Sequence, residues 1–248
     1  MAMTRKFADK IALVTGASRG IGRAVAKKLA AEGAHVILIA RTTGGLEELD
    51  DEIRAAGGSA TLVPLDLKDH ASIDGLAAPL LERYGRLDIL VANAGMLGRL
   101  TPLAQFPPEL WEQMFAVNVH ANWRLIRALD PLLRAAPAGR AIFVTSGASR
   151  SLKAYWGGYA TTKAALDAMV KVYAEETAKT NLRVNLLNPG ATRTSMRAQA
   201  FPGEDVNTLK SPEALLDVFM ALADPACTLH GEWVQAVEWL KEAKRAVH

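Results

Sequence analysis

The sequence predicts a doubly wound (Rossmann) α/β fold, with a mostly parallel sheet of about seven strands and helices on both faces. Two observations predict it. Strand-like and helix-like segments alternate along the chain. The strand-like segments are continuous apolar runs, which is typical of a parallel sheet covered on both faces. At a length of 248 residues, a (β/α)8 barrel is the rival architecture. No internal repeat or low-complexity linker is visible, so we expect one domain over residues 1–248.

The first half of the chain supplies four strands and three helices. Runs rich in Val, Ile and Leu predict buried strands over residues 11–14, 36–39, 60–63 and 87–91. Helical segments are expected between them, over residues 21–32, 46–56 and 72–84. Gly33 and the pair Gly57-Gly58 stand where the first two helices should stop.

The second half continues the alternation. A long helix is expected over residues 109–133, after a loop that contains Pro102, Pro107 and Pro108. Strands follow over residues 141–145 and 183–187, with a helix over residues 159–179 between them. Ser211-Pro212-Glu213 is a strong helix start, with an N-cap, a proline in the first turn and an acid. A short strand around Trp233-Val234 closes the predicted sheet.

Composition excludes several classes of function. The net charge of +3 is small and spread along the chain, so nucleic-acid binding is not implied. The single Cys227 rules out an internal disulfide and fits a reducing compartment. The first ten residues have no apolar signal core, and the apolar run 36–40 is too short to span a membrane. The five histidines show no metal-ligand spacing. We therefore expect a cytoplasmic protein without a metal, and no membrane or nucleic-acid partner.

A glycine-rich turn lies between the first strand and the first helix. In the segment Thr15–Gly22, Gly16 permits a tight turn, Gly20 lets the backbone approach a ligand, and Gly22 lets helix and strand pack closely. The helix N-terminus offers free N–H groups and a positive dipole end to a pyrophosphate. The spacing is G-x3-G-x-G, not the general G-x-G-x-x-G, and a plain turn is the alternative. Its position nevertheless favours dinucleotide binding.

The residues after the second strand indicate which dinucleotide. In the general fold an acid at the end of that strand binds the ribose 2′-hydroxyl, but here the strand ends in Arg41. Arg41 and Arg19 are suited to a 2′-phosphate, because a guanidinium offers a fork of donors. The sequence thus predicts NADP(H), with NAD(H) the less favoured cofactor. The alternative is that both arginines are solvated surface charges.

Tyr159 and Lys163 are the strongest candidates for chemistry. Four residues apart on a helix, they share one face. A lysine ammonium there favours the phenolate and lowers the tyrosine pKa from about 10, so that the tyrosine can transfer a proton. Tyr155 is the other candidate acid, but it has no lysine one turn later. Ser146 lies thirteen positions before Tyr159; it could otherwise be a turn former.

Several motifs agree in order and spacing. They are Thr15-Gly16-x3-Gly20-x-Gly22, Asp66 after the third strand, Asn93-Ala94-Gly95 after the fourth, Asn118 in the long helix, Ser146, Tyr159-x3-Lys163, and Asn188-Pro189-Gly190. With these motifs the chain resembles the short-chain dehydrogenase/reductases in their single-domain form. The resemblance runs from about Lys10 to the strand near Trp233.

The resemblance implies catalytic roles. Tyr159 would be the proton donor in reduction and the base in oxidation. Lys163 would form a hydrogen bond with the nicotinamide ribose and lower the tyrosine pKa. Ser146 would donate a hydrogen bond to the substrate oxygen as negative charge develops on it. Asn118 would hold a water that links Lys163 to solvent. Asn118 could equally be a satisfied polar residue of the core.

The resemblance also implies a cofactor site, in which the cofactor carries the hydride and the protein orients it. Asp66 would contact the adenine, and Thr192 with the segment Pro189-Gly190 would position the nicotinamide. The complete expected set is Gly16, Ser18, Arg19, Gly20, Ile21, Gly22, Arg41, Asp66, Leu67, Asn93, Ala94, Gly95, Tyr159, Lys163, Pro189, Gly190 and Thr192.

Two regions depart from the family or vary within it. Members often have a glycine pair near the last strand, whereas here only Gly231 is present. The family's tetramer is therefore in doubt, and a homodimer or homotetramer is expected. Residues 195–210 correspond to the substrate lid and predict a mobile loop over a small or medium substrate. The candidates for an apolar pocket wall are Leu97, Leu152, Tyr155, Trp156, Met196 and Phe201.

The expected function is an oxidoreductase that transfers a hydride between NADP(H) and a carbonyl or alcohol of a small molecule. The alternative is a non-catalytic NADP-binding sensor or scaffold of the same fold. Such proteins commonly lose a catalytic residue, and Ser146, Tyr159 and Lys163 are all present. A sugar-nucleotide epimerase would need a larger domain than the chain after Gly190 provides.

Overall fold

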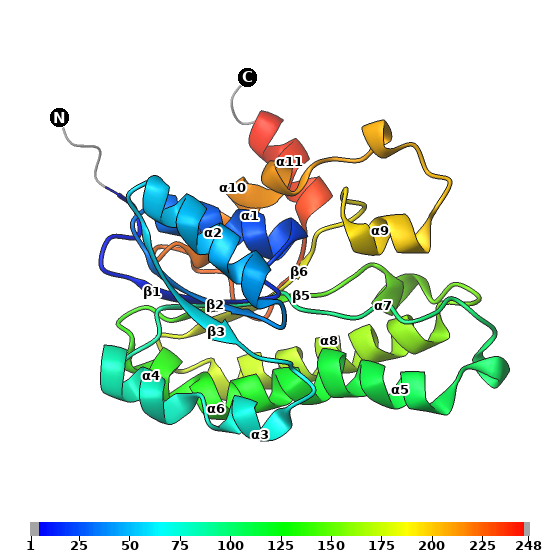
Figure 1. Ribbon diagram of the computed structural model, residues 1–248, viewed down its shortest axis with the longest axis horizontal. Coiled ribbons are helices and arrows are strands. Elements are labelled where there is room, and N and C mark those ends of the chain that lie inside the picture. Colours follow the sequence, from blue (N-terminus) through cyan, green and yellow to red (C-terminus); the bar gives the residue numbers. More distant parts are fainter. Residues whose placement is uncertain (1–4, 246–248) are drawn as a thin grey trace.

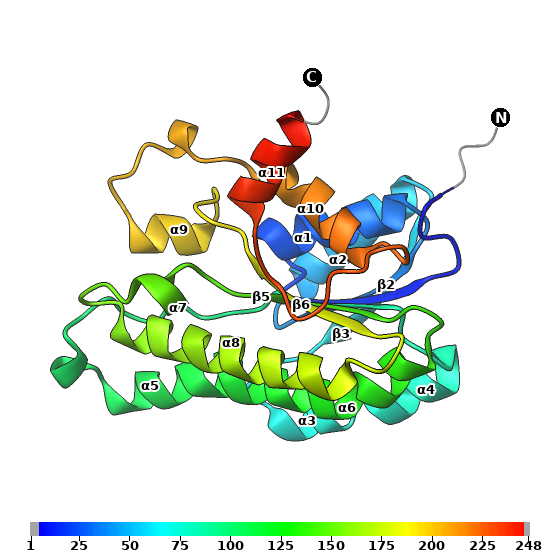
Figure 2. The same ribbon diagram turned by 180° about the vertical axis from the view of Figure 1, so that it is seen from behind.

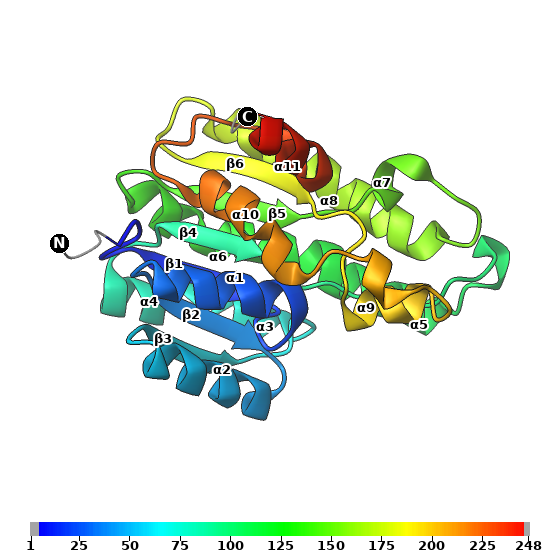
Figure 3. The ribbon, with the colours of Figure 1, turned by 90° about the horizontal axis from the view of Figure 1, so that it is seen from above.

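Seven parallel strands form one sheet in the computed structural model, which describes residues 5–245. Their order is β3-β2-β1-β4-β5-β6-β7, and Figure 3 shows the labelled strands from β3 to β6 from above. The strands are β1 (Ile11–Thr15), β2 (His35–Ala40), β3 (Ser59–Pro64), β4 (Ile89–Ala92), β5 (Arg140–Val144), β6 (Arg183–Asn188) and β7 (Trp233–Gln235). The chain moves outward from β1 in one direction and then, from β4, in the other. The predicted doubly wound fold is confirmed, and the barrel is excluded.

Helices cover both faces of the sheet (Figures 1 and 2). One face carries α1 (Gly20–Ala31), α2 (Thr43–Ala55), α10 (Leu216–Ala223) and α11 (Ala236–Arg245). The other carries α3 (His70–Asp74), α4 (Ala77–Tyr84), α5 (Pro108–Phe115), α6 (Ala121–Ala135) and α8 (Gly157–Thr177). The short helices α7 (Ala148–Ser151) and α9 (Ser195–Ala200) lie beyond the carboxyl ends of the strands (Figure 1).

The core is divided by the sheet because successive strand side chains point to opposite faces. Val14 and Leu38 pack with Leu29 of α1 in one cluster. Leu13 and Ile37 pack in the other, which includes residues of α6 and α8. Apolar side chains of the central strands are therefore buried on both sides, which explains the continuous apolar runs in the sequence.

Three predicted helices differ from those observed. The helix expected over residues 72–84 is interrupted at Gly75, a poor helix former, and becomes α3 and α4. The long helix expected over residues 109–133 contains a π-helical turn, η2 (Ala116–His120), between α5 and α6. The helix expected from Ser211 begins as a 3-10 turn, η4 (Pro212–Leu215), before α10. The π turn carries Asn118 and matters for the site below.

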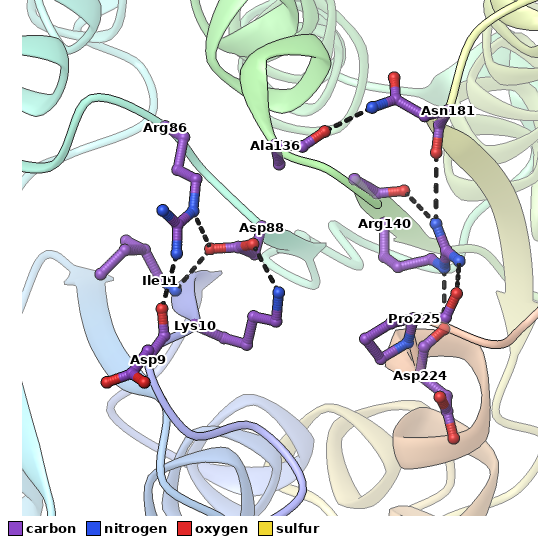
Figure 4. Close-up of polar contacts among 11 residues, drawn as sticks. Asp9, Lys10, Ile11, Arg86, Asp88, Ala136, Arg140, Asn181, Asp224 and Pro225 are labelled. Carbon is purple, nitrogen blue, oxygen red and sulfur yellow. Dashed lines mark hydrogen bonds and ion pairs between the residues drawn. The ribbon is translucent and has the colours of Figure 1, made fainter.

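Two buried charges secure the amino ends of the strands (Figure 4). The Asp88 carboxylate accepts hydrogen bonds from the Ile11 backbone N–H (3.0 Å), Arg86 Nε (3.0 Å) and Lys10 Nζ (3.2 Å). Arg140, which starts β5, donates to backbone carbonyls, among them that of Asp224 at 2.9 Å. Buried ions need such partners. The amino ends of these strands are thus closed by structural contacts, and the opposite, carboxyl ends are available for a cleft.

Candidate active site

A cavity of about 1020 Å³ lies at the carboxyl ends of the strands. In open α/β sheets this is where ligands bind, at the point where the strand order reverses. The predicted site residues that line it are Gly16, Ser18, Arg19, Gly20, Ile21, Arg41, Asp66, Leu67, Asn93, Ala94, Gly95, Ser146, Tyr159, Lys163, Pro189, Gly190 and Thr192. Gly22 and Asn118 are not in the lining. The structure therefore gathers residues from most βα loops of the chain around one space.

The glycine turn after β1 is closed by contacts that only glycine allows. Gly16 has φ +66°, and a Cβ there would lie 2.9 Å from Asn93 Nδ2. A Cβ on Gly22 would lie 2.3 Å from the Gly16 carbonyl oxygen and 2.5 Å from Asn93 Nδ2. Gly22 therefore serves helix packing, which is the contact expected of it. The first turn of α1 is held directly against the end of β1.

The amino end of α1 faces the cavity without an internal cap. Arg19 occupies the N-cap position with no side-chain capping bond, and the first turn has no acid. A Cβ on Gly20 would meet only the Thr194 methyl group, at 3.4 Å. Free N–H groups and the positive end of the helix dipole suit an anion such as a pyrophosphate.

Thr15 joins the two strands on either side of the switch point. Its hydroxyl oxygen accepts hydrogen bonds from the backbone N–H groups of Asn93 and Ala94, both at 3.0 Å. Asn93 Nδ2 in turn donates to the Thr15 carbonyl at 3.0 Å. Asn93 thus braces the turn between β1 and β4. Thr15 was not among the expected site residues, although its place directly before Gly16 could have suggested it.

Arg19 and Arg41 are exposed at the rim of the cavity. Neither side chain has an ion-pair or hydrogen-bond partner within the part of the chain that the structure describes. Asp66 accepts a hydrogen bond from the Lys68 backbone N–H at 3.0 Å. Two unpaired guanidinium groups at the end of β2 and the start of α1 can receive an anionic group of a ligand.

Tyr159 and Lys163 lie one turn apart on the inner face of α8, only 8% and 3% exposed. Lys163 Nζ donates to the Val144 carbonyl at the end of β5, at 2.8 Å. It lies 5.9 Å from the centre of the Tyr159 ring. The Ser146 hydroxyl accepts the Ala148 N–H at 3.2 Å, which leaves its own hydrogen for another acceptor. The three side chains meet on one wall of the cavity.

The expected lowering of the Tyr159 pKa by Lys163 is wrong for this structure. Burial raises the pKa of Tyr159 to about 12, and the Ser146 hydroxyl opposes this in part. Burial also lowers the pKa of Lys163 to about 8, with the Asp167 carboxylate acting in the opposite direction. The reason is that both groups lose solvent together, and desolvation disfavours both charged forms.

Asn118 is fully buried and its amide is engaged with the protein. Its side-chain oxygen accepts the Met96 N–H at 2.8 Å. Its Nδ2 donates to the Met96 carbonyl at 2.8 Å and to Thr162 Oγ1 at 3.0 Å. The π turn therefore fastens the loop after β4 to α8, next to Tyr159 and Lys163. A water held by Asn118 stays a prediction.

Several apolar side chains line the end of the cavity beside Tyr159, where a substrate is expected. Leu97, Trp156, Met196 and Phe201 line it, as expected. The Met196 sulfur lies 4.0 Å from Tyr159 Oη. Trp156 packs against both Tyr159 and Phe201, with ring centres 6.2 and 5.7 Å apart. The tyrosine hydroxyl is therefore covered by a thioether.

Leu152 and Tyr155 were wrongly expected in this wall. They have left-handed backbone conformations, with φ of 45° and 71°. These conformations turn both side chains outward, where they are 68% and 60% exposed. Tyr155 thus contacts neither the cavity nor Lys163, and its position argues against it as the acid.

The lid segment 195–210 contains α9, where a mobile loop was expected. Thr194 caps the helix by accepting the Arg197 N–H at 3.2 Å. Arg197 makes a bidentate ion pair with Glu204, at 2.6 and 2.5 Å. Gln199 Nε2 donates to the Gly98 carbonyl at 3.0 Å, and both residues line the cavity. The segment expected to be a lid is thus attached to the loop after β4.

Comparison with known proteins agrees with this architecture. A doubly wound sheet with a glycine turn at its switch point is the architecture of dinucleotide-binding proteins. The family model "short chain dehydrogenase" matches residues 10–205. The uncharacterized oxidoreductase YciK of Escherichia coli is 41% identical over 217 residues, covering 86% of each chain. The chain belongs to the short-chain dehydrogenase/reductase family of oxidoreductases.

Other relatives have ligands or substrates in their names. The 2,3-dihydro-2,3-dihydroxybenzoate dehydrogenase of Bacillus subtilis is 34% identical over 196 residues, covering 79% of this chain and 75% of that protein. A short chain dehydrogenase from Shigella flexneri complexed with NADP has a TM-score of 0.91 at 38% identity, covering 94% of this chain and 99% of that one. One from Escherichia coli complexed with NADPH has a TM-score of 0.88 at 38% identity, covering 94% and 98%.

Residues 5–245 contain neither a candidate membrane helix nor a candidate metal-binding cluster. Among these residues, no helix has both the length and the apolar character needed to cross a membrane. Within the same range, no group of three or more His, Cys, Asp or Glu side chains is arranged to hold a metal ion.

Proposed function

We propose that this chain is an NADP(H)-dependent oxidoreductase that interconverts a carbonyl and an alcohol of a small molecule, with Tyr159 as general acid/base. One observation carries the proposal. Tyr159, Lys163 and Ser146 meet on one wall of a cavity whose other end has the features of a dinucleotide site. A cytoplasmic location and a homodimer or homotetramer are proposed from the sequence alone.

The state of Tyr159 suits the reduction of a carbonyl. With a pKa of about 12, the phenol keeps its proton at neutral pH and can donate it to the substrate oxygen. The Ser146 hydroxyl can donate a hydrogen bond to the same oxygen as negative charge develops there. A bound nicotinamide supplies or accepts the hydride. Lys163 holds a positive charge beside the phenolate that forms.

The choice of NADP(H) rests on Arg19 and Arg41. Both lie at the rim with no partner among residues 5–245, where an acid would have favoured a ribose hydroxyl. The relatives solved with NADP and NADPH support this choice. Residues 16–22 fit a pyrophosphate, because Gly20 leaves the end of α1 open. Asp66 lies in the same lining and would contact the adenine.

The test is turnover with NADPH against a panel of carbonyl compounds, followed by absorbance. Tyr159→Phe should abolish turnover, whereas NADPH binding should change little because the phenyl ring is retained. Tyr155→Phe is the matched control and should keep full activity. Full activity of Tyr159→Phe would contradict the assignment. NADPH binding by the wild type without turnover on any compound would favour a sensor or scaffold.

A second experiment addresses the cofactor alone. We expect a lower Michaelis constant for NADPH than for NADH, and loss of that difference in Arg19→Gln/Arg41→Gln. Each charge-assisted contact to a phosphate is worth about 1.5–3 kcal/mol, which is about tenfold or more in affinity. Equal constants for both cofactors in the wild type would refute the preference.

A further inference from the structure

Asp167 lies on the helix face that carries the proposed chemistry. Tyr159, Lys163 and Asp167 follow one another at four-residue intervals on α8, so each lies one turn beyond the last. The residue is half-buried. Its place could have been found from the sequence by extending the four-residue spacing by one step.

The Asp167 carboxylate joins three other elements to α8. It accepts hydrogen bonds from Thr145 Oγ1 at the end of β5, from Ser149 Oγ of α7 at 2.6 Å, and from Trp233 Nε1 of β7 at 3.0 Å. Thr145 directly precedes Ser146, and the Ser149 hydroxyl also lies 2.9 Å from the Ser146 carbonyl oxygen. One carboxylate therefore fixes the segment that carries Ser146 against the helix that carries Tyr159.

The hydrogen bonds do not by themselves require an acid. Two hydroxyls and an indole are neutral, and an amide could satisfy all three. Its oxygen would accept from Ser149 and Trp233, and its NH2 group would donate to the Thr145 hydroxyl. A carboxylate is the more costly group to remove from water. The three hydrogen bonds therefore do not explain why position 167 carries a carboxylate instead of an amide, and we look for a group on which its charge acts.

Lys163 is the group on which this charge can act. No cation forms an ion pair with Asp167 among the residues that the structure describes. Arg150 and Lys171 lie on the helices that bind or carry Asp167, and both contact other groups. Arg150 of α7 stacks over the Trp233 ring at 3.6 Å, and Lys171, one turn further along α8, donates to the Gly231 carbonyl.

We propose that Asp167 is a positioning residue for the proposed reaction, holding the Ser146 segment against α8 and keeping Lys163 in its ammonium form. The inference rests on the proposed function only where it refers to turnover. Its electrostatic part concerns Lys163 itself and can be measured without a substrate.

The direction of the effect follows from the burial of Lys163. Burial lowers the pKa of Lys163 to about 8, and the Asp167 charge works against this. In Asp167→Asn that opposition is lost, so the Lys163 pKa falls further and more of the lysine is neutral near pH 8. A neutral lysine does not stabilise the phenolate that forms when Tyr159 donates its proton, so carbonyl reduction should slow at a lower pH in the variant than in the wild type.

The experiment compares Asp167→Asn with Trp233→Phe. In carbonyl reduction with NADPH, the falling limb of kcat against pH should move down by about one unit in Asp167→Asn, which lowers kcat on that limb about tenfold. Trp233→Phe removes a donor but keeps the charge, so its limb should stay in place while its unfolding temperature falls. The Kd for NADPH should be similar in all three proteins.

If the limb of kcat against pH in Asp167→Asn coincides with that of the wild type, the electrostatic role of Asp167 is overturned. An equal shift in Trp233→Phe would reduce Asp167 to a packing residue. NMR titration of the Lys163 ε-methylene in the same variants separates this inference from the proposed function. It should show a lower midpoint in Asp167→Asn even if no carbonyl compound is reduced, and an unchanged midpoint would reject the proposal.

Discussion

The two ends of the cleft are built in different ways. The cofactor end is made of backbone, with glycines, Thr15 and Asn93 closing turns that follow β1 and β4. The substrate end is made of side chains from α9 and from the segment before α8, where Met196 and Trp156 meet Tyr159. At Gly16 and Gly22 the first end accepts no added atom, because a Cβ there would meet backbone atoms and the Asn93 amide. The second can change shape by rotating side chains.

The difference teaches where stability and function conflict. At the cofactor end the functional geometry is also the packed geometry, so the same contacts serve both. At the substrate end, two titratable groups are buried and both have shifted pKa values. Variants at the two ends should therefore fail for different reasons, and four of them measure this.

The largest effect is expected for Gly22→Ala. The new Cβ would lie 2.3 Å from the Gly16 carbonyl oxygen, so α1 must move away from the turn. We expect the free energy of unfolding to fall by about 3 kcal/mol, near the upper end for overpacking, and NADPH binding to be lost. The measurements are urea denaturation and NADPH fluorescence.

Gly44→Ala is the matched control for Gly22→Ala. A Cβ at Gly44 would meet nothing within 4 Å, and alanine is the better helix former. The unfolding temperature of Gly44→Ala should be unchanged or slightly higher. Wild-type NADPH binding in Gly22→Ala would show that the cofactor end is more adaptable than its contacts indicate.

This contrast also explains what could be predicted from the sequence. The cofactor end follows from local βα turns, so Gly16, Gly22 and Asn93 lie in the turns where their position after strands predicts them. The outward orientation of Tyr155 depends on a left-handed backbone that no spacing reveals. The Asn118 contact joins residues 22 positions apart through a π turn.

The sign of the Tyr159 pKa shift could not be predicted either. A spacing of four residues places Lys163 beside Tyr159, but it does not say that both lose their water. Spacing gives neighbours along one helix, whereas burial depends on every element packed against that helix. The contact of Met196 with the Tyr159 hydroxyl also depends on a separate element packed against this helix.

The second prediction concerns the pH dependence of stability at the chemical centre. In nucleotide-free protein the pKa of Lys163 is about 8, against about 10.4 in an unfolded chain. Between these values the unfolded state binds more protons, so the free energy of unfolding rises with pH. Below pH 8 both states are charged and the folded state bears the full cost of burying the ammonium.

Lys163→Met should remove this rise. At pH 7 the variant should be the more stable protein. Its advantage should shrink by on the order of 2–3 kcal/mol between pH 7 and pH 10, as seen by urea denaturation at several pH values. Lys179→Met, just beyond the end of α8, is the control for loss of an exposed lysine. A constant difference between Lys163→Met and the wild type across this range would contradict the burial argument.

The third prediction is that Met196 affects the substrate end alone. Met196→Ala should admit water to Tyr159, so that the pKa of Tyr159 falls from about 12 toward its usual value. We expect a several-fold loss in kcat/KM, about 1 kcal/mol, with an unchanged Kd for NADPH. Met196→Leu keeps the volume and should retain the wild-type pH profile. A weaker affinity for NADPH in Met196→Ala would instead connect the two ends.

The smallest effect is expected for Gln199→Ala, which removes the bond between α9 and the Gly98 carbonyl. This bond is exposed, so its loss should cost about 0.5 kcal/mol of lid closure, the low end for a hydrogen bond. Amides of α9 should exchange faster in hydrogen-exchange mass spectrometry, and KM should rise about twofold. Gln105→Ala, outside the cavity lining, is the control.

The outcome for Gln199→Ala decides whether the substrate end is held by one contact or by many. Faster exchange without a change in KM would mean that substrate itself closes the lid. No change in either would mean that the Arg197–Glu204 ion pair and the packing of Phe201 on Trp156 hold α9 without help. In that case the substrate end would be nearly as fixed as the cofactor end, and the contrast would lie in its chemistry instead of its mobility.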